Sequence, residues 1–225
     1  ITRKTRFPSQ AASNGGTGYR SINHLGSISP AVLVGASVSR QTLARHYRLQ
    51  EGINVPDHCL LYFSSLGPSY TGQLRPNIVA PGSALSSTAL IDDGSSMKNG
   101  TSMAAPITAG AVAALLSAVR TEAEYARLEA WRQEKIKAIR GKTDEAKYSL
   151  TSVSMAIRTA LEESATELAD YTLAQQGHGL LNIDAAYDAL LSLATEINQN
   201  NRRLPEFMIN GNDENRRLYD RSNNI

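Results

Sequence analysis

The hydrophobic and polar positions divide this chain into short apolar runs, one long apolar run and a charged, periodic segment. Residues 30–38 form a short apolar run with β-branched members, which predicts a buried parallel strand. Residues 59–63 form a second apolar run and predict another strand. The residues between the two runs are mixed and polar, so we expect them to lie on the surface.

The longest apolar run, residues 107–117, follows the sequence Asn99-Gly100-Thr101-Ser102-Met103-Ala104-Ala105-Pro106. Asn99 and Gly100 predict a turn because both residue types tolerate positive φ. We expect Ser102 to be the N-cap of a helix and Pro106 to lie in its first turn, where a missing N–H leaves no bond unmade. Since the run is apolar nearly all round and Gly110 admits a close neighbour, the helix is predicted to be buried.

A hydroxyl at the start of a buried helix lies at the positive end of the helix dipole, which suits a nucleophile that passes through an anionic intermediate. The alternative is that Ser102 only caps a core helix. The full string resembles the nucleophile motif of the subtilisin-like serine peptidases. The resemblance implies an α/β fold, of the subtilisin-like three-layer kind with a mainly parallel sheet. It also implies a Ser-His-Asp triad whose members follow one another in the order Asp, His, Ser.

A second segment, residues 7–18, would on its own be interpreted as a flexible polar loop. Beside the serine motif it resembles the family segment that carries the oxyanion-hole asparagine, which implies this role for Asn14. An amide on a glycine-rich turn can approach a carbonyl oxygen without steric hindrance. The family usually has glycine before this asparagine, where this chain has Ser13, and we expect Ser13 to narrow the P1 side-chain pocket. The resemblance implies four substrate-binding residues: Ala12, Ser13, Gly15 and Thr101.

Two further matches follow in the family's order. Residues 64–68 resemble its Ser-Ser-Arg-Gly-Pro turn, with Leu66 where arginine is usual, and residues 75–82 match the stretch that leads to the nucleophile loop. Several details look like the tripeptidyl-peptidase II branch of the family: residues 47–51, Asn99, residues 174–188 and residues 216–221. That branch implies release of tripeptides from free N-termini, whereas the general family match predicts endopeptidase activity equally well.

After the serine helix, residues 120–147 are rich in Glu, Lys, Arg and Ala, which predicts a solvated, protruding helical insertion. Its basic residues interleave with acidic ones and have no stacking aromatics, so a subunit contact in a homo-oligomer is favoured over nucleic acid. Residues 148–168 predict a second amphipathic helix, and residues 176–187 resemble the glycine turn and helix that close the family's catalytic domains. We therefore expect residues 1–197 to be the C-terminal part of the peptidase domain. Residues 198–225 are predicted to be a linker and the start of a β-rich region.

Composition limits the alternatives. A length of 225 residues that are 41% hydrophobic allows one sizeable core, and a net charge of +2 argues against a polyanionic partner. The single cysteine, Cys59, excludes an internal disulfide framework and fits a reducing, cytoplasmic compartment. We expect no apolar run to reach membrane-spanning length, and the basic residues 1–6 precede no apolar signal region. The motifs require no metal and no cofactor.

The triad's other members have no counterpart in the sequence. All four histidines, His24, His46, His58 and His178, follow Asn14, whereas the family places its Asp and His before that asparagine. Because the first residue is not Met, we expect a piece of a longer chain, whose missing N-terminal half of the catalytic domain supplies both residues. Two functions stay open: a serine peptidase that acts on peptides or proteins through Ser102, and a degenerate subtilisin-like scaffold for binding or assembly. Ser13 and Leu66 favour the scaffold, and the intact Gly-Thr-Ser-Met-Ala-Ala-Pro string favours the peptidase.

Overall fold

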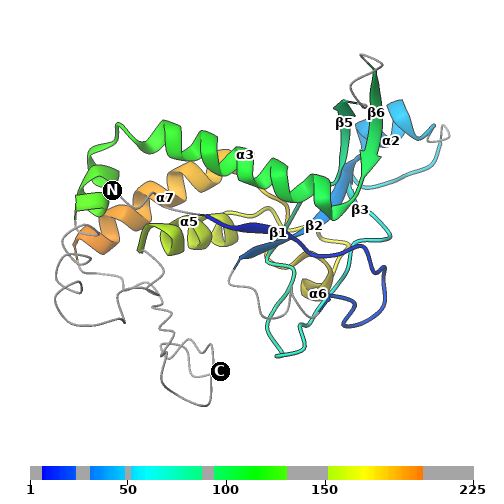
Figure 1. The fold of residues 1–225 in the computed structure, drawn as a ribbon, viewed down its shortest axis with the longest axis horizontal. Coiled ribbons are helices and arrows are strands. Elements are labelled where there is room, and N and C mark those ends of the chain that lie inside the picture. Colours follow the sequence, from blue (N-terminus) through cyan, green and yellow to red (C-terminus); the bar gives the residue numbers. More distant parts are fainter. Residues whose placement is uncertain (1–6, 24–30, 49–51, 88–93, 131–151, 200–225) are drawn as a thin grey trace. The chain divides into compact units, whose positions relative to one another are not determined.

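The computed structural model describes residues 7–23, 31–48, 52–87, 94–130 and 152–199, which form two compact units (Figure 1). The first, here called the sheet unit, comprises the described residues of Phe7–Ala113 and Glu162–Ile183. The second, here called the helical unit, comprises the described residues of Ala114–Leu161 and Asp184–Ile225.

Strand β2, Val32–Ser39, is the central strand of the sheet unit. It pairs in parallel with β1, Ser9–Ala11, and with β4, Ile78–Pro81, and antiparallel with β3, His58–Leu60. Because Val34 pairs with both β1 and β4, those two strands lie on opposite edges of β2. Seven of the eight β2 residues are buried, so the predicted buried parallel strand is confirmed. The second predicted strand is shorter than its apolar run and antiparallel.

Both faces of β2 carry apolar side chains, because successive residues point to opposite sides of a sheet. One face packs in a buried cluster with the start of the long helix: Val32, Val34, Ile78, Ala80, Ala104 and Ala105. The other face contributes Leu33 to a cluster with Ala12 and Ile22. The sheet therefore fixes the loop after β1 and the first turns of the helix against the same central strand.

The long helix α3, Thr101–Val119, begins two residues earlier than an N-cap at Ser102 would allow. The Gly100 carbonyl accepts hydrogen bonds from the N–H groups of Met103 at 3.0 Å and Ala104 at 3.4 Å, so Gly100 occupies the N-cap position. The prediction that Ser102 is the N-cap is wrong: Ser102 is the second helical residue. Pro106 lies inside the helix and not in its first turn, so it cannot donate to the Ser102 carbonyl.

Helix α3 is buried on one face only, which corrects the prediction of full burial. Its buried residues recur three or four apart: Thr101, Ala104, Ala105, Thr108, Val112, Leu115 and Val119. The opposite face is exposed and small: Ser102, Pro106, Ala109, Gly110, Ala113, Ala114, Ser117 and Ala118. A Cβ on Gly110 would meet no described atom within 4 Å, so the close neighbour predicted at this glycine is not found among the described residues.

By length and composition α3 is apolar enough to cross a membrane, with 19 residues and a hydropathy of 1.7. This corrects the expectation that no apolar run reaches that length. Core helices of globular domains meet the same criterion, and Ala104 and Ala105 of α3 belong to the buried cluster on the sheet.

A two-stranded antiparallel hairpin connects the sheet to α3. Its strands are β5, Ser83–Ser87, and β6, Ser95–Asn99, and Ser83 pairs with Asn99 at its base (Figure 1). The short helix α2, Arg40–His46, follows β2 directly and is capped by the Ser39 hydroxyl, which accepts a hydrogen bond from the Thr42 N–H at 3.1 Å. The serine-rich sequence of the hairpin gives no hydrophobic alternation, so the sequence did not predict it.

Helices α5, Ser152–Glu163, and α7, Ile183–Asn198, lie for most of their length in the helical unit, and α6, Leu173–Gln176, lies in the sheet unit. The predicted apolar face of α5 is confirmed, since its Ala156, Ile157, Ala160 and Leu161 are fully buried. The predicted glycine turn precedes α7 and contains two glycines at positive φ, Gly177 and Gly179. The linker and β-rich end were predicted for residues 198–225; Asn198 is instead the last residue of α7, and residues 200–225 lie outside the described residues.

The start of the charged segment belongs to a core, contrary to the prediction of a protruding insertion. Residues 123–130 are helical, and both Tyr125 and Leu128 are buried. The Asn198 amide donates a hydrogen bond to the Glu124 carbonyl at 3.0 Å, which ties this helix to the end of α7. The prediction failed because it relied on the number of large apolar residues, whereas these two are placed on one face. Trp131 and residues 132–147 lie outside the described residues.

Truncation of Leu128 tests this correction. We expect Leu128→Ala to lower the free energy of unfolding by about 2–5 kcal/mol, because it leaves a cavity where a fully buried side chain stood. The adjacent Arg127→Ala is the matched control, since its side chain is 69% exposed and its ion pair with Glu124 lies at the surface. Denaturant unfolding of both variants measures the difference. Equal free energies of unfolding would mean that this segment is solvated and not part of a core.

Candidate active site

The residues that the sequence assigned to nucleophile and oxyanion donor, Ser102 and Asn14, both lie beside Gly100 in the structure. Ser102 lies in the first turn of α3, and Asn14 lies in the loop that follows β1. Both side chains belong to exposed residues of the sheet unit. The site is therefore open to a ligand from solvent.

Asn14 is held in one orientation by Thr101. Its side-chain oxygen accepts hydrogen bonds from the Thr101 N–H at 3.0 Å and from the Thr101 hydroxyl at 2.9 Å. Thr101 is only 1% exposed, so this anchor is itself fixed in the core. Because the oxygen is occupied, the Asn14 amide nitrogen is the end that remains to donate to another group.

Gly100 leaves free the space that the two functional groups share. A Cβ at this position would lie 2.8 Å from the Ser102 hydroxyl oxygen and 3.5 Å from the Asn14 amide nitrogen. The hydroxyl and the amide donor thus lie on the side of Gly100 where a Cβ would project, so a side chain at position 100 would crowd both groups. This arrangement is what the attack of a hydroxyl on a carbonyl requires: a nucleophile and a fixed donor for the developing oxyanion.

The turn that carries Ser102 is fastened to the central strand through Gly82. The Gly82 N–H donates to the Ser37 carbonyl at 2.8 Å, and the Gly82 carbonyl accepts from the Gly100 N–H at 2.9 Å. A Cβ on Gly82 would lie 2.4 Å from the Cβ of Ala36, so only glycine allows this close approach. The sequence reasoning noted Gly82 as part of a motif but missed this contact.

The loop that carries Asn14 is fastened to residues 63–65. The Ser65 N–H donates to the Ser13 carbonyl at 3.0 Å, the Ser65 hydroxyl accepts from the Gly15 N–H at 2.8 Å, and the Phe63 carbonyl accepts from the Gly16 N–H at 2.9 Å. Ser13 itself has a φ of 91°, in the region that favours glycine. This gives a physical reason for the glycine that the resemblance led us to expect before Asn14.

The Ser102 hydroxyl makes few polar contacts within the described ranges. Its one partner there is the Met103 sulfur at 3.6 Å. The start of α3 supplies a positive helix end beside it. The ring nitrogen Nε2 of His178 lies 3.9 Å from the Glu162 carboxylate, and the His178 backbone N–H donates to the Asn77 carbonyl. These contacts belong to the closing turn and not to Ser102. In the same ranges no group of His, Cys, Asp and Glu has the composition of a metal site.

Of the predicted substrate-binding residues, Ser13 and Gly15 flank Asn14 in its loop, and Thr101 is buried as the anchor of Asn14. Ala12 is 1% exposed and packs with Ile22 and Leu33. Its side chain therefore packs the loop against the core, and its backbone N–H donates to the Val34 carbonyl at 3.0 Å.

A separate hollow of about 80 Å³ lies in the sheet unit between residues 60–66 and Tyr171. Neither Ser102 nor Asn14 lines it. Burial raises the pKa of the Tyr171 hydroxyl, which accepts a hydrogen bond from the Leu60 N–H at 3.0 Å. The hollow is thus walled by a structural tyrosine and is distinct from the space at Gly100.

Comparison with known proteins shows the family to which this chain belongs. A profile of the subtilase family, peptidase S8, matches residues 3–179. Pyrolysin from Pyrococcus furiosus is 27% identical over 203 residues, which cover 81% of this chain and 12% of pyrolysin. Tripeptidyl-peptidase 2 from Drosophila melanogaster is 33% identical over 158 residues, which cover 70% of this chain and 9% of that protein.

Among solved structures, the prenylagaramide maturation protease PagA matches with a TM-score of 0.51 at 23% identity, over 83% of this chain and 50% of that chain. Together with the mainly parallel sheet, this confirms the predicted subtilisin-like α/β fold. The chain spans about a tenth of the length of the curated relatives and half of that solved structure.

Proposed function

This chain belongs to the subtilase family, and we propose that it contributes the nucleophile and an oxyanion donor to a serine peptidase. The observation that carries the proposal is the pair of groups beside Gly100: a Cβ on this glycine would lie 2.8 Å from the Ser102 hydroxyl oxygen and 3.5 Å from the Asn14 amide nitrogen. The peptide carbonyl of a substrate would lie next to these two groups. No metal or cofactor takes part in the proposed reaction.

In this reaction the Ser102 oxygen attacks the carbonyl carbon of the scissile bond, and a histidine takes the hydroxyl proton. The Asn14 amide and the Ser102 N–H donate to the oxygen that becomes negative. The histidine then gives its proton to the leaving amine, which leaves an acyl-enzyme on Ser102 that water hydrolyses. An aspartate orients the histidine, and both come from polypeptide outside these 225 residues.

Two features of the sheet unit support a contribution from further polypeptide. Within the described residues β1 pairs with β2 alone, so its far edge has no strand beside it. The exposed apolar face of α3 begins at Ser102, next to the site. A missing N-terminal half of the domain would extend the sheet at β1 and cover that face.

We assign direct substrate binding to Ser13 and Gly15. Thr101 and Ala12 are each 1% exposed, so we assign them an indirect part in it, through the positions of Asn14 and of its loop. Ser13 places a side chain, at positive φ, in the loop where the resemblance implies a wall of the P1 pocket. We infer that it narrows this pocket and favours small P1 side chains. The alternative function is a degenerate scaffold for binding or assembly. Ser13 and Leu66 favour it, because both depart from the family pattern.

The finer function that we propose is release of N-terminal tripeptides, because relatives of this chain bear the name tripeptidyl-peptidase 2. We place the protein in the cytoplasm, since one cysteine in 225 residues fits a reducing compartment, and we include a homo-oligomer in the proposal.

One pair of peptides tests both the peptidase activity and the release of N-terminal tripeptides. The full-length protein is incubated with a peptide that has a free N-terminus and with its N-acetylated twin, and the products are identified by mass. Tripeptides from the free form alone are the expected result, because an exopeptidase must bind the free α-ammonium group. Equal internal cleavage of both peptides would replace tripeptide release by endopeptidase activity, and cleavage of neither would favour the scaffold.

A further inference from the structure

Three polar side chains, those of Tyr47, Ser83 and Asn99, form a cluster at the base of the β5–β6 hairpin. Asn99 lies three residues before Ser102. Tyr47 immediately follows α2, and its hydroxyl lies 2.6 Å from the Ser83 hydroxyl. The Tyr47 hydroxyl also donates a hydrogen bond to the side-chain oxygen of Asn99, and the Ser83 hydroxyl lies 2.8 Å from that same oxygen. The cluster joins three segments of the sheet unit: the end of α2, the start of β5 and the end of β6.

The Tyr47 hydroxyl touches both strands of the hairpin. The Asn99 oxygen is an acceptor only, and it accepts from the Tyr47 hydroxyl and from the Ser83 hydroxyl. The Tyr47 hydroxyl also lies against the Ser83 hydroxyl. One tyrosine thus connects Ser83, the first residue of β5, to Asn99, the last residue of β6, across their register pair.

The position of Tyr47 is set independently of the hairpin. Its N–H donates to the Leu43 carbonyl at 3.0 Å, which closes α2, and α2 is joined directly to the central strand β2. The hydroxyl is therefore presented from the end of a helix that continues the central strand. Although the Tyr47 residue is 38% exposed, its hydroxyl group makes both of these contacts.

Asn99 directly precedes the residues that form the site. The next residue is Gly100, whose N–H donates to Gly82, and then Thr101, whose N–H donates to Asn14. A shift of Asn99 would move this turn and with it the space between Ser102 and Asn14. Displacements of about 1 Å at such a site reduce rates by about 10²-fold, so anchoring of this turn matters for catalysis.

We propose that Tyr47 is a positioning residue for the nucleophile turn: its hydroxyl holds Asn99 and thereby sets Gly100, Thr101 and Ser102. The proposal rests on the peptidase function above. It assigns to Tyr47 no contact with substrate. Loss of one hydrogen bond of this kind corresponds to roughly a three- to tenfold change in an equilibrium or a rate.

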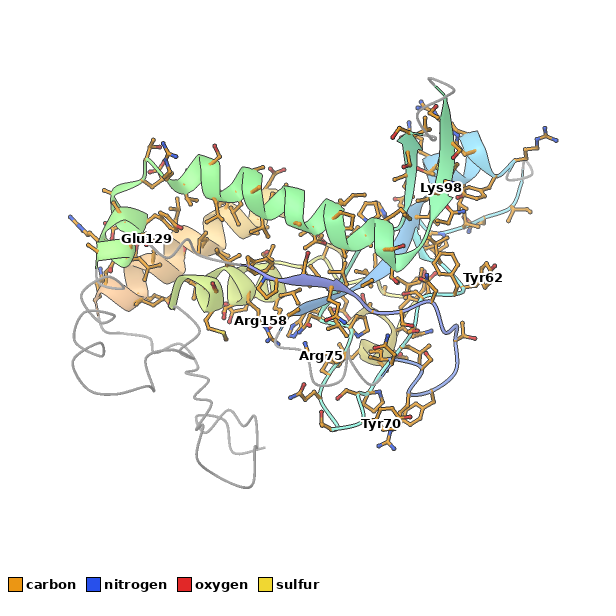
Figure 2. The ribbon with its side chains drawn as sticks, in the orientation of Figure 1. Tyr62, Tyr70, Arg75, Lys98, Glu129 and Arg158 are labelled. Carbon is orange, nitrogen blue, oxygen red and sulfur yellow. The ribbon has the colours of Figure 1, made fainter. Side chains whose placement is uncertain are left out.

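The test compares Tyr47→Phe with Tyr62→Phe in the full-length protein. Tyr62 is the matched control because it is 80% exposed, and Figure 2 shows its side chain pointing away from the ribbon. We expect Tyr47→Phe to lower kcat about three- to tenfold with KM and melting temperature unchanged, and Tyr62→Phe to change neither constant. Asn99→Ala should lower kcat as well, and the double variant should be no slower than Asn99→Ala alone, since Tyr47 acts through Asn99.

Amide hydrogen exchange separates this proposal from the peptidase function. The N–H groups of Gly100 and Thr101 should exchange about three- to tenfold faster in Tyr47→Phe than in the wild type, whether or not the protein cleaves peptides. Unchanged exchange at both amides would overturn the positioning role, and so would additive kcat losses in the double variant. An inactive wild type with faster exchange in Tyr47→Phe would instead overturn the peptidase function and retain the role of Tyr47 in holding the turn.

Discussion

Replacing Asn14 by alanine should lower kcat of the full-length peptidase about 10²- to 10³-fold, or about 2.7–4 kcal/mol, with little change in KM. This magnitude is the one found on removal of a single oxyanion donor from a subtilisin. The physical reason is that the Asn14 amide would act on charge that exists only in the transition state. Steady-state kinetics on a short peptide measure the effect.

The variant Asn14→Asp separates the oxyanion role from the anchoring role. Aspartate keeps an oxygen that can accept from the Thr101 N–H and hydroxyl, which now bond to Asn14 at 3.0 and 2.9 Å, but it has no amide to donate. We expect it to be at least as slow as Asn14→Ala. Wild-type kcat in Asn14→Asp would mean that Asn14 serves only to hold Thr101, and that another group stabilises the oxyanion.

Replacing Ser102 by alanine should have the largest effect of all. Without the hydroxyl no acyl-enzyme forms, and losses of about 10⁶-fold in kcat are typical when a subtilisin-type nucleophile is removed. Ser117→Ala is the matched control, because Ser117 is another exposed serine on the same helix. The control should retain wild-type kcat, and residual Ser102→Ala activity within tenfold of the wild type would assign the reaction to another residue.

Motifs in the sequence identified two candidate site residues, and their catalytic roles stay predictions. Ser102 and Asn14 were predicted from separate motifs, and they meet in the structure because β1 and α3 both pack on β2. The apolar face of α5 was also predictable, since helical spacing alone identifies its buried residues.

The failures have physical causes in tertiary structure. The start of α3 depends on which carbonyl accepts the first helical hydrogen bonds, and Gly100 takes that position because its turn is bonded to Gly82. The exposure of α3 could not be read from composition, because small apolar residues line both its faces. Tyr125 and Leu128 were misjudged because two well-placed side chains suffice to bury a charged helix. The Tyr47 cluster joins residues 47, 83 and 99, and no sequence pattern connects them.

Labelling with a fluorophosphonate is the most direct test of the central claim that Ser102 is the nucleophile. The reagent forms a covalent bond with an activated serine, and digestion followed by mass spectrometry identifies the modified residue. In the full-length protein the account predicts a single adduct on Ser102, and none in Ser102→Ala. An adduct on a different serine, or none on Ser102 while the protein still cleaves peptides, would contradict the account.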